Sequence, residues 1–148
     1  MAWHPHLWHP ITQVARSDAP NRVVRAQGSV LQLEDGRELI DAISSWWVTL
    51  HGHAEPSVAE AIGRQAQQLE QVIFANFSHR PAEELASRLS ALSGLERLFF
   101  SDNGSSAVEV ALKMAWQWWR NQGSERRQLI AFEGAYHGDT FGAMAVGD

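Results

Sequence analysis

The 148-residue sequence contains no cysteine, which excludes disulfide bonds and thiolate metal sites. It has no run of about 18 apolar residues, so no membrane-spanning segment is predicted. The first ten positions hold His, Trp and Pro residues where a signal peptide needs an apolar core. The net charge of −5 gives no reason to expect nucleic acid or an anionic membrane surface as a partner. These absences favour a soluble, cytoplasmic protein.

Two nucleotide-binding motifs are also missing. The sequence has no Gly-x-Gly-x-x-Gly, which argues against a dinucleotide site, and no Gly-Lys-Ser or Gly-Lys-Thr, which leaves a Walker-type loop unsupported. What the sequence does contain is typical of a folded chain, because 45% of residues are hydrophobic, 20% are charged and seven are Trp. The length predicts one domain or less.

A stretch of small and polar residues from 101 to 107 separates two apolar patterns. The run Leu98-Phe99-Phe100 before it is strand-like, and a helical pattern begins at Gly104 and continues to about Arg120. The first backbone N–H groups of a helix have no partner within the helix, and the helix dipole adds partial positive charge there. A strand, a small-residue turn and a helix start therefore predict an anion site.

Three residues of this turn suit a phosphate. Gly104 would let a phosphate approach the backbone closely, and the hydroxyls of Ser105 and Ser106 can donate hydrogen bonds. The simpler alternative is an ordinary strand-to-helix turn in which Asn103 or Ser105 caps the helix. Both interpretations stay open on these residues alone.

A second polar turn follows the strand candidate from Gln128 to Phe132. Tyr136 offers a flat face and a hydroxyl, His137 can stack or exchange protons near neutral pH, and Asp139 can accept hydrogen bonds from a cation. A short helix is expected after Thr140. The alternation of helices and strands predicts an α/β domain with a mainly parallel sheet, in which both turns lie at carboxyl ends of strands and form one site. A flat phosphorylated ligand, such as a nucleotide or pyridoxal phosphate, suits that site.

The first half of the chain predicts a small antiparallel sheet followed by helices. Strand-like segments cover 23–26, 30–33 and 38–42, with a turn signal at Asp35-Gly36. Two amphipathic helices are expected from Pro56 and from Pro81, the second ending near Gly94. Their apolar stripes, and the Phe residues between the helices, are expected in the core: Val58, Ile62, Leu69, Leu85, Leu89, Leu92, Phe74 and Phe77.

Adjacent Trp46 and Trp47 lie between these regions. Neighbouring residues point to different sides of a regular element, so one face cannot bury both rings, and at least one is free to line a cleft or an interface. Burial of both through different contacts is the alternative. His51 and His53 could share a metal ion, but a structural turn around Gly52 is favoured, since no acidic or Cys partner is expected near them.

In these motifs the chain resembles the N-terminal third of class III, fold-type I, pyridoxal-phosphate-dependent aminotransferases. The resemblance implies an incomplete α/β fold of the aspartate aminotransferase type. Residues 1–50 would form an N-terminal arm and small-domain strands, and residues 51–148 would begin the cofactor-binding large domain with its mainly parallel sheet. The matching segments are Trp8-His9-Pro10, Asp35-Gly36-Arg37, Ser44-Ser45-Trp46-Trp47, residues 102–109 and Tyr136-His137-Gly138-Asp139-Thr140.

The resemblance also implies residue roles. The pyridoxal phosphate would be bound by Gly104, Ser105, Ser106, Tyr136 and His137, and the substrate by Trp46, Trp47, Tyr136 and Asp139, with no metal ion. The first and third segments resemble most the members that act in biotin synthesis. These members transfer an amino group from S-adenosylmethionine to 8-amino-7-oxononanoate, giving 7,8-diaminononanoate, and work as homodimers with sites at the subunit interface.

Transamination needs a lysine that forms a Schiff base with the cofactor. The only lysine is Lys113, which lies about 13 Å along the helix from Gly104 at the usual helical rise. The family's lysine is expected beyond residue 148, so these 148 residues alone are predicted to be inactive. Their sheet would lack most of its strands and expose edges, so a stable fold is not expected for them either. Ile11 stands where the family often has Tyr. Two alternatives therefore remain: a class III enzyme for an ω-amino acid or diamine, and a non-catalytic truncated product.

Overall fold

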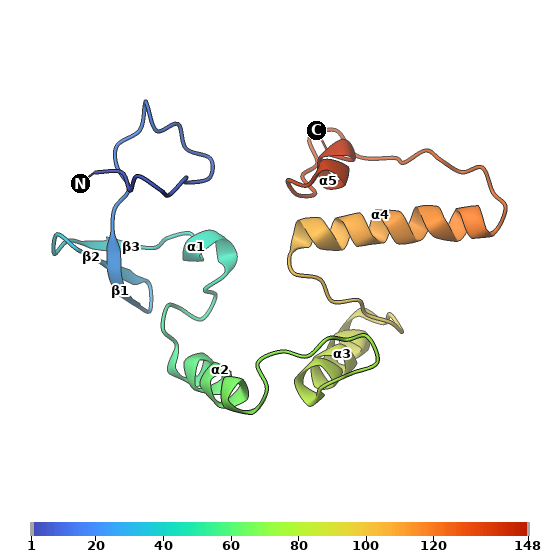
Figure 1. The fold of residues 1–148 in the computed structure, drawn as a ribbon, viewed down its shortest axis with the longest axis horizontal. Coiled ribbons are helices and arrows are strands. Elements are labelled where there is room, and N and C mark those ends of the chain that lie inside the picture. The colour runs from blue at the N-terminus through green and yellow to red at the C-terminus, as the bar shows by residue number, and fades with distance from the viewer. Residues whose placement is uncertain (1, 148) are drawn as a thin grey trace. The chain divides into compact units, whose positions relative to one another are not determined.

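The computed structural model describes residues 2–147. The chain divides into two compact units, Met1–Val72 and Ile73–Asp148. Figure 1 shows the order of the elements along the chain. Every helix within residues 2–147 is too short or too polar to cross a membrane.

The first unit contains the small antiparallel sheet that the sequence predicts. The strand order is β1-β2-β3, with Ala26 opposite Leu31 and Leu31 opposite Leu39. Gly36 forms the β2–β3 turn with a φ of +86°, and Leu33 beside it is 3% exposed. The strands are β1 (Val23–Gln27), β2 (Val30–Leu33) and β3 (Glu38–Ile40), in blue and cyan in Figure 1.

The short element α1 (Ser44–Trp47) is a left-handed turn. All four residues have positive φ angles, between 47° and 69°, and none of them is glycine. A left-handed helical conformation costs about 1–2 kcal/mol per residue with an L side chain. The turn therefore needs contacts that compensate for this cost, and the sequence pattern did not predict it.

Two helices, α2 (Pro56–Gln68) and α3 (Arg80–Ser93), begin close to the predicted residues, and α3 also ends where predicted. The Glu55 carboxylate caps α2 by accepting from Val58 N, and Gly94 ends α3 with a φ of +72°. The expected burial of their stripes is wrong for this structure, because Ile62 is 64% and Leu92 is 84% exposed. Among the described residues no element packs on either helix.

The second unit contains α4 (Gly104–Asn121), orange in Figure 1, and α5 (Phe141–Ala145), red, which pack against each other around buried Ala143. The two strands expected here, at 98–100 and 128–132, are not formed. A strand exists only when a neighbour accepts its backbone hydrogen bonds, and no described segment pairs with either. Their apolar side chains are exposed except Leu98, which is half-buried. Phe74 and Phe77, which were expected in the core, are exposed as well.

Candidate functional site

The site begins at the first turn of α4. Asn103 has an extended backbone, its Oδ1 accepts from Ser106 N at 2.9 Å, and its carbonyl accepts from Ala107 N at 3.0 Å. Asn103 is thus the N-cap, one of the two residues considered from the sequence. The first N–H groups of a helix have no helical partner, and the cap satisfies only that of Ser106. The N–H groups of Gly104 and Ser105 are therefore left without a helical partner.

The space in front of Gly104 is open. A Cβ atom built at this position meets no side chain or distant backbone atom within 4 Å, and the residue is exposed. An anion can therefore approach the backbone here, where the unpaired N–H groups and the helix dipole favour negative charge.

The second polar turn lies directly against the first. Asp139 N donates to Ser105 Oγ at 3.0 Å, across 34 positions of sequence. A Cβ on Gly138 would lie 2.0 Å from the same oxygen, and Gly138 has a φ of +121°. Only glycine fits this close approach. The hydroxyl of Ser105 uses an oxygen lone pair in this contact, so its hydrogen remains able to donate to an anion.

Tyr136 and Asp139 form a pair within the second turn. The Tyr136 hydroxyl donates to Asp139 Oδ2 at 3.1 Å. This hydrogen bond, burial and the nearby negative charge all raise the pKa of the Tyr136 phenol. The tyrosine ring is 76% exposed and His137 beside it is exposed, so both rings are available to a ligand.

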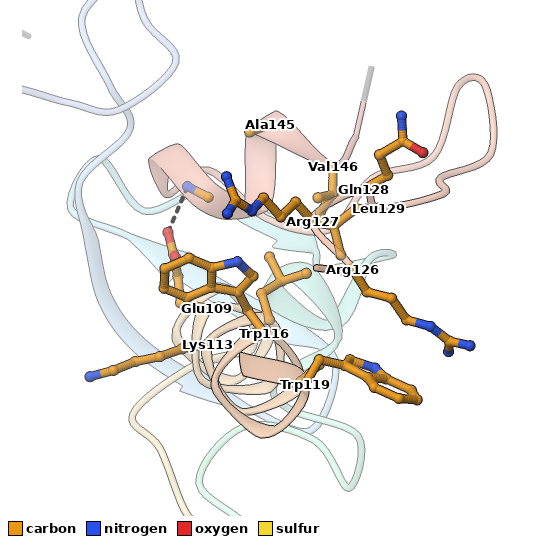
Figure 2. A pocket seen from close by; sticks show the side chains of 13 residues that line it. Glu109, Lys113, Trp116, Trp119, Arg126, Arg127, Gln128, Leu129, Ala145 and Val146 are labelled. Atoms are coloured by element: carbon orange, nitrogen blue, oxygen red, sulfur yellow. Dashed lines mark hydrogen bonds between the residues drawn. The ribbon is translucent and has the colours of Figure 1, made fainter. Parts of the chain in front are cut away.

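Glu109 is a member of this cluster that sequence analysis missed. Its Oε1 accepts from Gly142 N at 2.7 Å, the dashed line in Figure 2, and so joins α4 to the start of α5. The Thr140 hydroxyl and the Gly142 and Ala143 N–H groups lower the pKa of the Glu109 carboxyl. The i, i+4 spacing from Ser105 was the available signal, because it places both side chains on one face of α4.

Trp46 and Trp47 belong to the first unit, where they are 58% and 76% exposed. Asp41, which lies between β3 and these tryptophans in the sequence, makes two side-chain contacts. Its Oδ2 accepts from Ser45 Oγ at 2.7 Å and lies 2.7 Å from His53 Nε2. The sequence argument that His53 has no acidic partner is therefore wrong, since the fold brings Asp41 to it from twelve positions away. No group of three His, Asp or Glu residues that could hold a metal ion is found within residues 2–147.

A hollow of about 810 Å³ lies elsewhere in the second unit, between α4 and the segments 126–129 and 142–146. Figure 2 shows its wall, with Trp116 and Trp119 from α4 and Arg126, whose guanidinium lies 3.9 Å from the Trp119 ring centre. Lys113 lies at its edge on α4. None of the predicted cofactor or substrate residues lines the hollow, so we do not assign the site to it.

A family model and the similar proteins all point to the same family, the class III aminotransferases. A protein-family model described as "Aminotransferase class-III" matches residues 12–148. The chain is 60% identical over 150 aligned positions to an adenosylmethionine-8-amino-7-oxononanoate aminotransferase from Synechococcus elongatus, covering 100% of this chain and 35% of that protein.

Two solved structures resemble the chain closely. An adenosylmethionine-8-amino-7-oxononanoate aminotransferase from Methanocaldococcus jannaschii has a TM-score of 0.90 and 35% identity, covering 96% of this chain and 34% of that one. An amine transaminase from an uncultivated Pseudomonas species, in its PLP-bound form, has a TM-score of 0.86 and 32% identity, covering 97% and 34%. These likenesses confirm the predicted partial α/β fold of the fold-type I aminotransferases.

The chain spans about a third of the length of the relatives that it matches. The family match nevertheless covers nearly all of it, and the helix start, the glycine contact and the aromatic turn lie within the matched residues. The chain belongs to the aminotransferase class-III family.

Proposed function

We propose that this chain forms the N-terminal part of a pyridoxal-phosphate-dependent enzyme that transfers the amino group of S-adenosylmethionine to 8-amino-7-oxononanoate. The similarity to relatives of that name supports the choice of substrates. The contact between Ser105 Oγ and Asp139 N is the observation that carries the proposal, because it joins an anion-binding helix start to an exposed aromatic turn.

The residues present fit such a cofactor. Its phosphate needs unpaired N–H groups and hydroxyls, which Gly104, Ser105 and Ser106 supply at the open start of α4. Its flat ring needs an exposed aromatic surface nearby, which Tyr136 and His137 supply. When bound, pyridoxal phosphate provides the electron sink for amino transfer.

The chain's own residues bind and orient the reacting groups. Ser105 holds the Asp139 N–H on its oxygen and directs its hydrogen to the phosphate. The Tyr136 phenol donates to Asp139 beside the substrate amine, and this hydrogen bond raises the pKa of the phenol. Trp46 and Trp47 line the substrate pocket.

The remaining parts of the proposal concern the longer protein. Residues 1–50 form an arm and small-domain strands, and residues 51–148 begin the cofactor-binding domain. Lys113 does not bind the cofactor, because it lies two and a half turns along α4 from the anion site, so the required lysine comes from beyond residue 148. The enzyme is a cytoplasmic homodimer with its sites at the interface.

A second candidate is a class III aminotransferase for an ω-amino acid or a diamine. Ile11 favours it, because this residue is 84% exposed and has no hydroxyl to recognise a substrate where the family often has Tyr. The likeness to an amine transaminase is compatible with this candidate as well.

The first test is the DNA sequence beyond codon 148. An open frame that encodes a lysine after a strand supports the proposal, whereas a stop codon at this point contradicts catalysis and favours a non-catalytic product. The full-length protein is then assayed for 7,8-diaminononanoate, with S-adenosylmethionine or a diamine as amino donor. No 7,8-diaminononanoate with either donor, together with transfer of an amino group from a diamine or an ω-amino acid to an oxo acid, would replace the first candidate by the second.

A further inference from the structure

The cluster of Asp41, Ser45 and His53 has no role in the proposed reaction. The Asp41 side chain is only 6% exposed and that of His53 16%, although most of the first unit is open to solvent. One carboxylate oxygen, Asp41 Oδ2, meets both Ser45 Oγ and His53 Nε2 at 2.7 Å. The Ser45 backbone N–H and hydroxyl, followed by the His53 ring, hold the pKa of Asp41 well below its usual range.

Both ends of this cluster are anchored to the sheet. His53 exchanges backbone hydrogen bonds with Gly28, at 2.7 and 3.0 Å, and Gly52 lies so close to Gly28 that a Cβ would be 2.9 Å from its Cα. Asp41 N donates to Ser29 O at 2.8 Å. The carboxylate is therefore held in place from the loop between β1 and β2.

The third member, Ser45, lies inside the left-handed turn α1. This turn has four successive positive φ angles without a glycine, and its two tryptophans are exposed, so burial of the rings does not hold it. The Ser45 hydroxyl on Asp41 is the side-chain contact that connects the turn to the sheet. The backbone contributes Trp47 N to Ile43 O at 3.0 Å and Thr49 N to Ser44 O at 3.1 Å.

We propose that Asp41, Ser45 and His53 act as positioning residues that hold the Ser44–Trp47 turn in its left-handed form, and thereby set substrate selectivity through Trp46 and Trp47. The selectivity part rests on the proposed function, in which the two indoles contact the substrate. None of the three is among the residues that the proposed function places against substrate or cofactor. Their effect is on where the rings stand, and so on substrate binding more than on the chemical step.

The test uses Asp41→Asn and His53→Leu in the full-length protein, with two matched controls. Asp35→Asn changes a carboxylate that is bonded to Arg37 in the β2–β3 turn, away from α1. His53→Gln keeps an N–H donor for Asp41. Hydrogen exchange by mass spectrometry follows the amides of residues 44–49, and steady-state kinetics give KM and kcat for both substrates.

Loss of a hydrogen bond to a charged group predicts exchange of residues 44–49 about tenfold faster, and a KM about tenfold higher with kcat little changed. We expect these changes in Asp41→Asn and His53→Leu, and recovery in His53→Gln. Unchanged exchange at 44–49 would show that the three residues do not hold the Ser44–Trp47 turn. Faster exchange with an unchanged KM would show that the turn does not set substrate selectivity. If the unmutated protein does not transaminate, the proposed function is refuted. The exchange result at 44–49 still tests whether the three residues hold the turn.

Discussion

At the scale of single residues, pairs of side chains far apart in sequence define the candidate site. Ser105 meets the backbone of Asp139, and Glu109 meets that of Gly142, each across more than 30 positions. Each residue type was visible in the sequence, but a hydrogen-bond partner at that separation has no local signal. Sequence reasoning therefore placed Ser105 and Asp139 in one site from strand topology, and left Glu109 out.

Tyr136 gives a direct test of its pair with Asp139 in the full-length protein, where its tyrosinate signal is obtained as the difference from Tyr136→Phe. Asp139 accepts from the phenol and opposes its ionisation, so Asp139→Asn should move the phenol pKa down toward the ordinary value of about 10. A spectrophotometric titration of tyrosinate absorbance measures this shift. Asp102→Asn, which alters a carboxylate outside the pair, should leave the midpoint unchanged. Equal midpoints in Asp139→Asn and the unmutated chain would contradict the pairing.

Glu109 makes the contact between α4 and α5 depend on pH. Its pKa is lower in the folded chain than when unfolded, so its stabilising contribution is complete above the unfolded value of about 4.3 and is lost as pH falls through the folded value. The protection factor of the Gly142 amide, which removes the intrinsic pH dependence of exchange, should therefore fall at acidic pH in the full-length protein, and Glu109→Gln should remove most of that dependence. NMR exchange of Gly142 measures it. Glu125→Gln, outside both helices, should retain the dependence.

At the scale of elements, local sequence predicted most boundaries. Pro56 and Pro81 lie in the first turns of α2 and α3, Gly94 ends α3, and Gly104 begins α4. These signals act within a few residues, which explains why they succeed without tertiary information. The turn α1 is the exception, because its positive φ angles are held by Asp41 from another part of the unit.

The open start of α4 leads to a prediction for Gly104→Ala in the full-length protein. The φ of Gly104 is not in the left-handed region, and its Cβ position is empty, so alanine should not destabilise the helix. The added methyl group occupies the approach to the backbone N–H groups, and the affinity for pyridoxal phosphate should fall about tenfold. Absorbance titration with the cofactor measures this change. Gly63→Ala, at an equally open position within α2, is the control that should keep full affinity.

At the scale of the whole molecule, little apolar surface is buried. Within the described residues only Leu33 and Ala143 are buried hydrophobic side chains, and the chain exposes 13028 Å². Even two separate compact units of half the mass would together expose only about 9,000 Å². We therefore expect the isolated 148 residues to unfold over a broad range of urea and to bind a hydrophobic dye. A sharp two-state transition without dye binding would contradict this expectation.

The same chain should not transaminate. Its only lysine, Lys113, is exposed on α4 away from the anion site, so addition of pyridoxal phosphate and amino donor should give no product above background. Product assay by mass spectrometry tests this directly. In the full-length protein Lys113→Arg should leave kcat unchanged, and loss of turnover in that variant would place the cofactor lysine on α4.

The sequence alone determined the helix starts and ends, the antiparallel hairpins and the motifs of a class III aminotransferase, because each depends on neighbouring residues or on residue identity. Tertiary structure decided three further matters: the contact of Ser105 and Glu109 with the 138–142 segment, the left-handed turn held by Asp41 and His53, and the absence of the predicted strands at 98–100 and 128–132. Each depends on a hydrogen-bonding partner from a distant part of the chain. Where such a partner is present, even an unfavourable backbone persists, and where none pairs, an apolar segment of strand-like sequence does not form a strand.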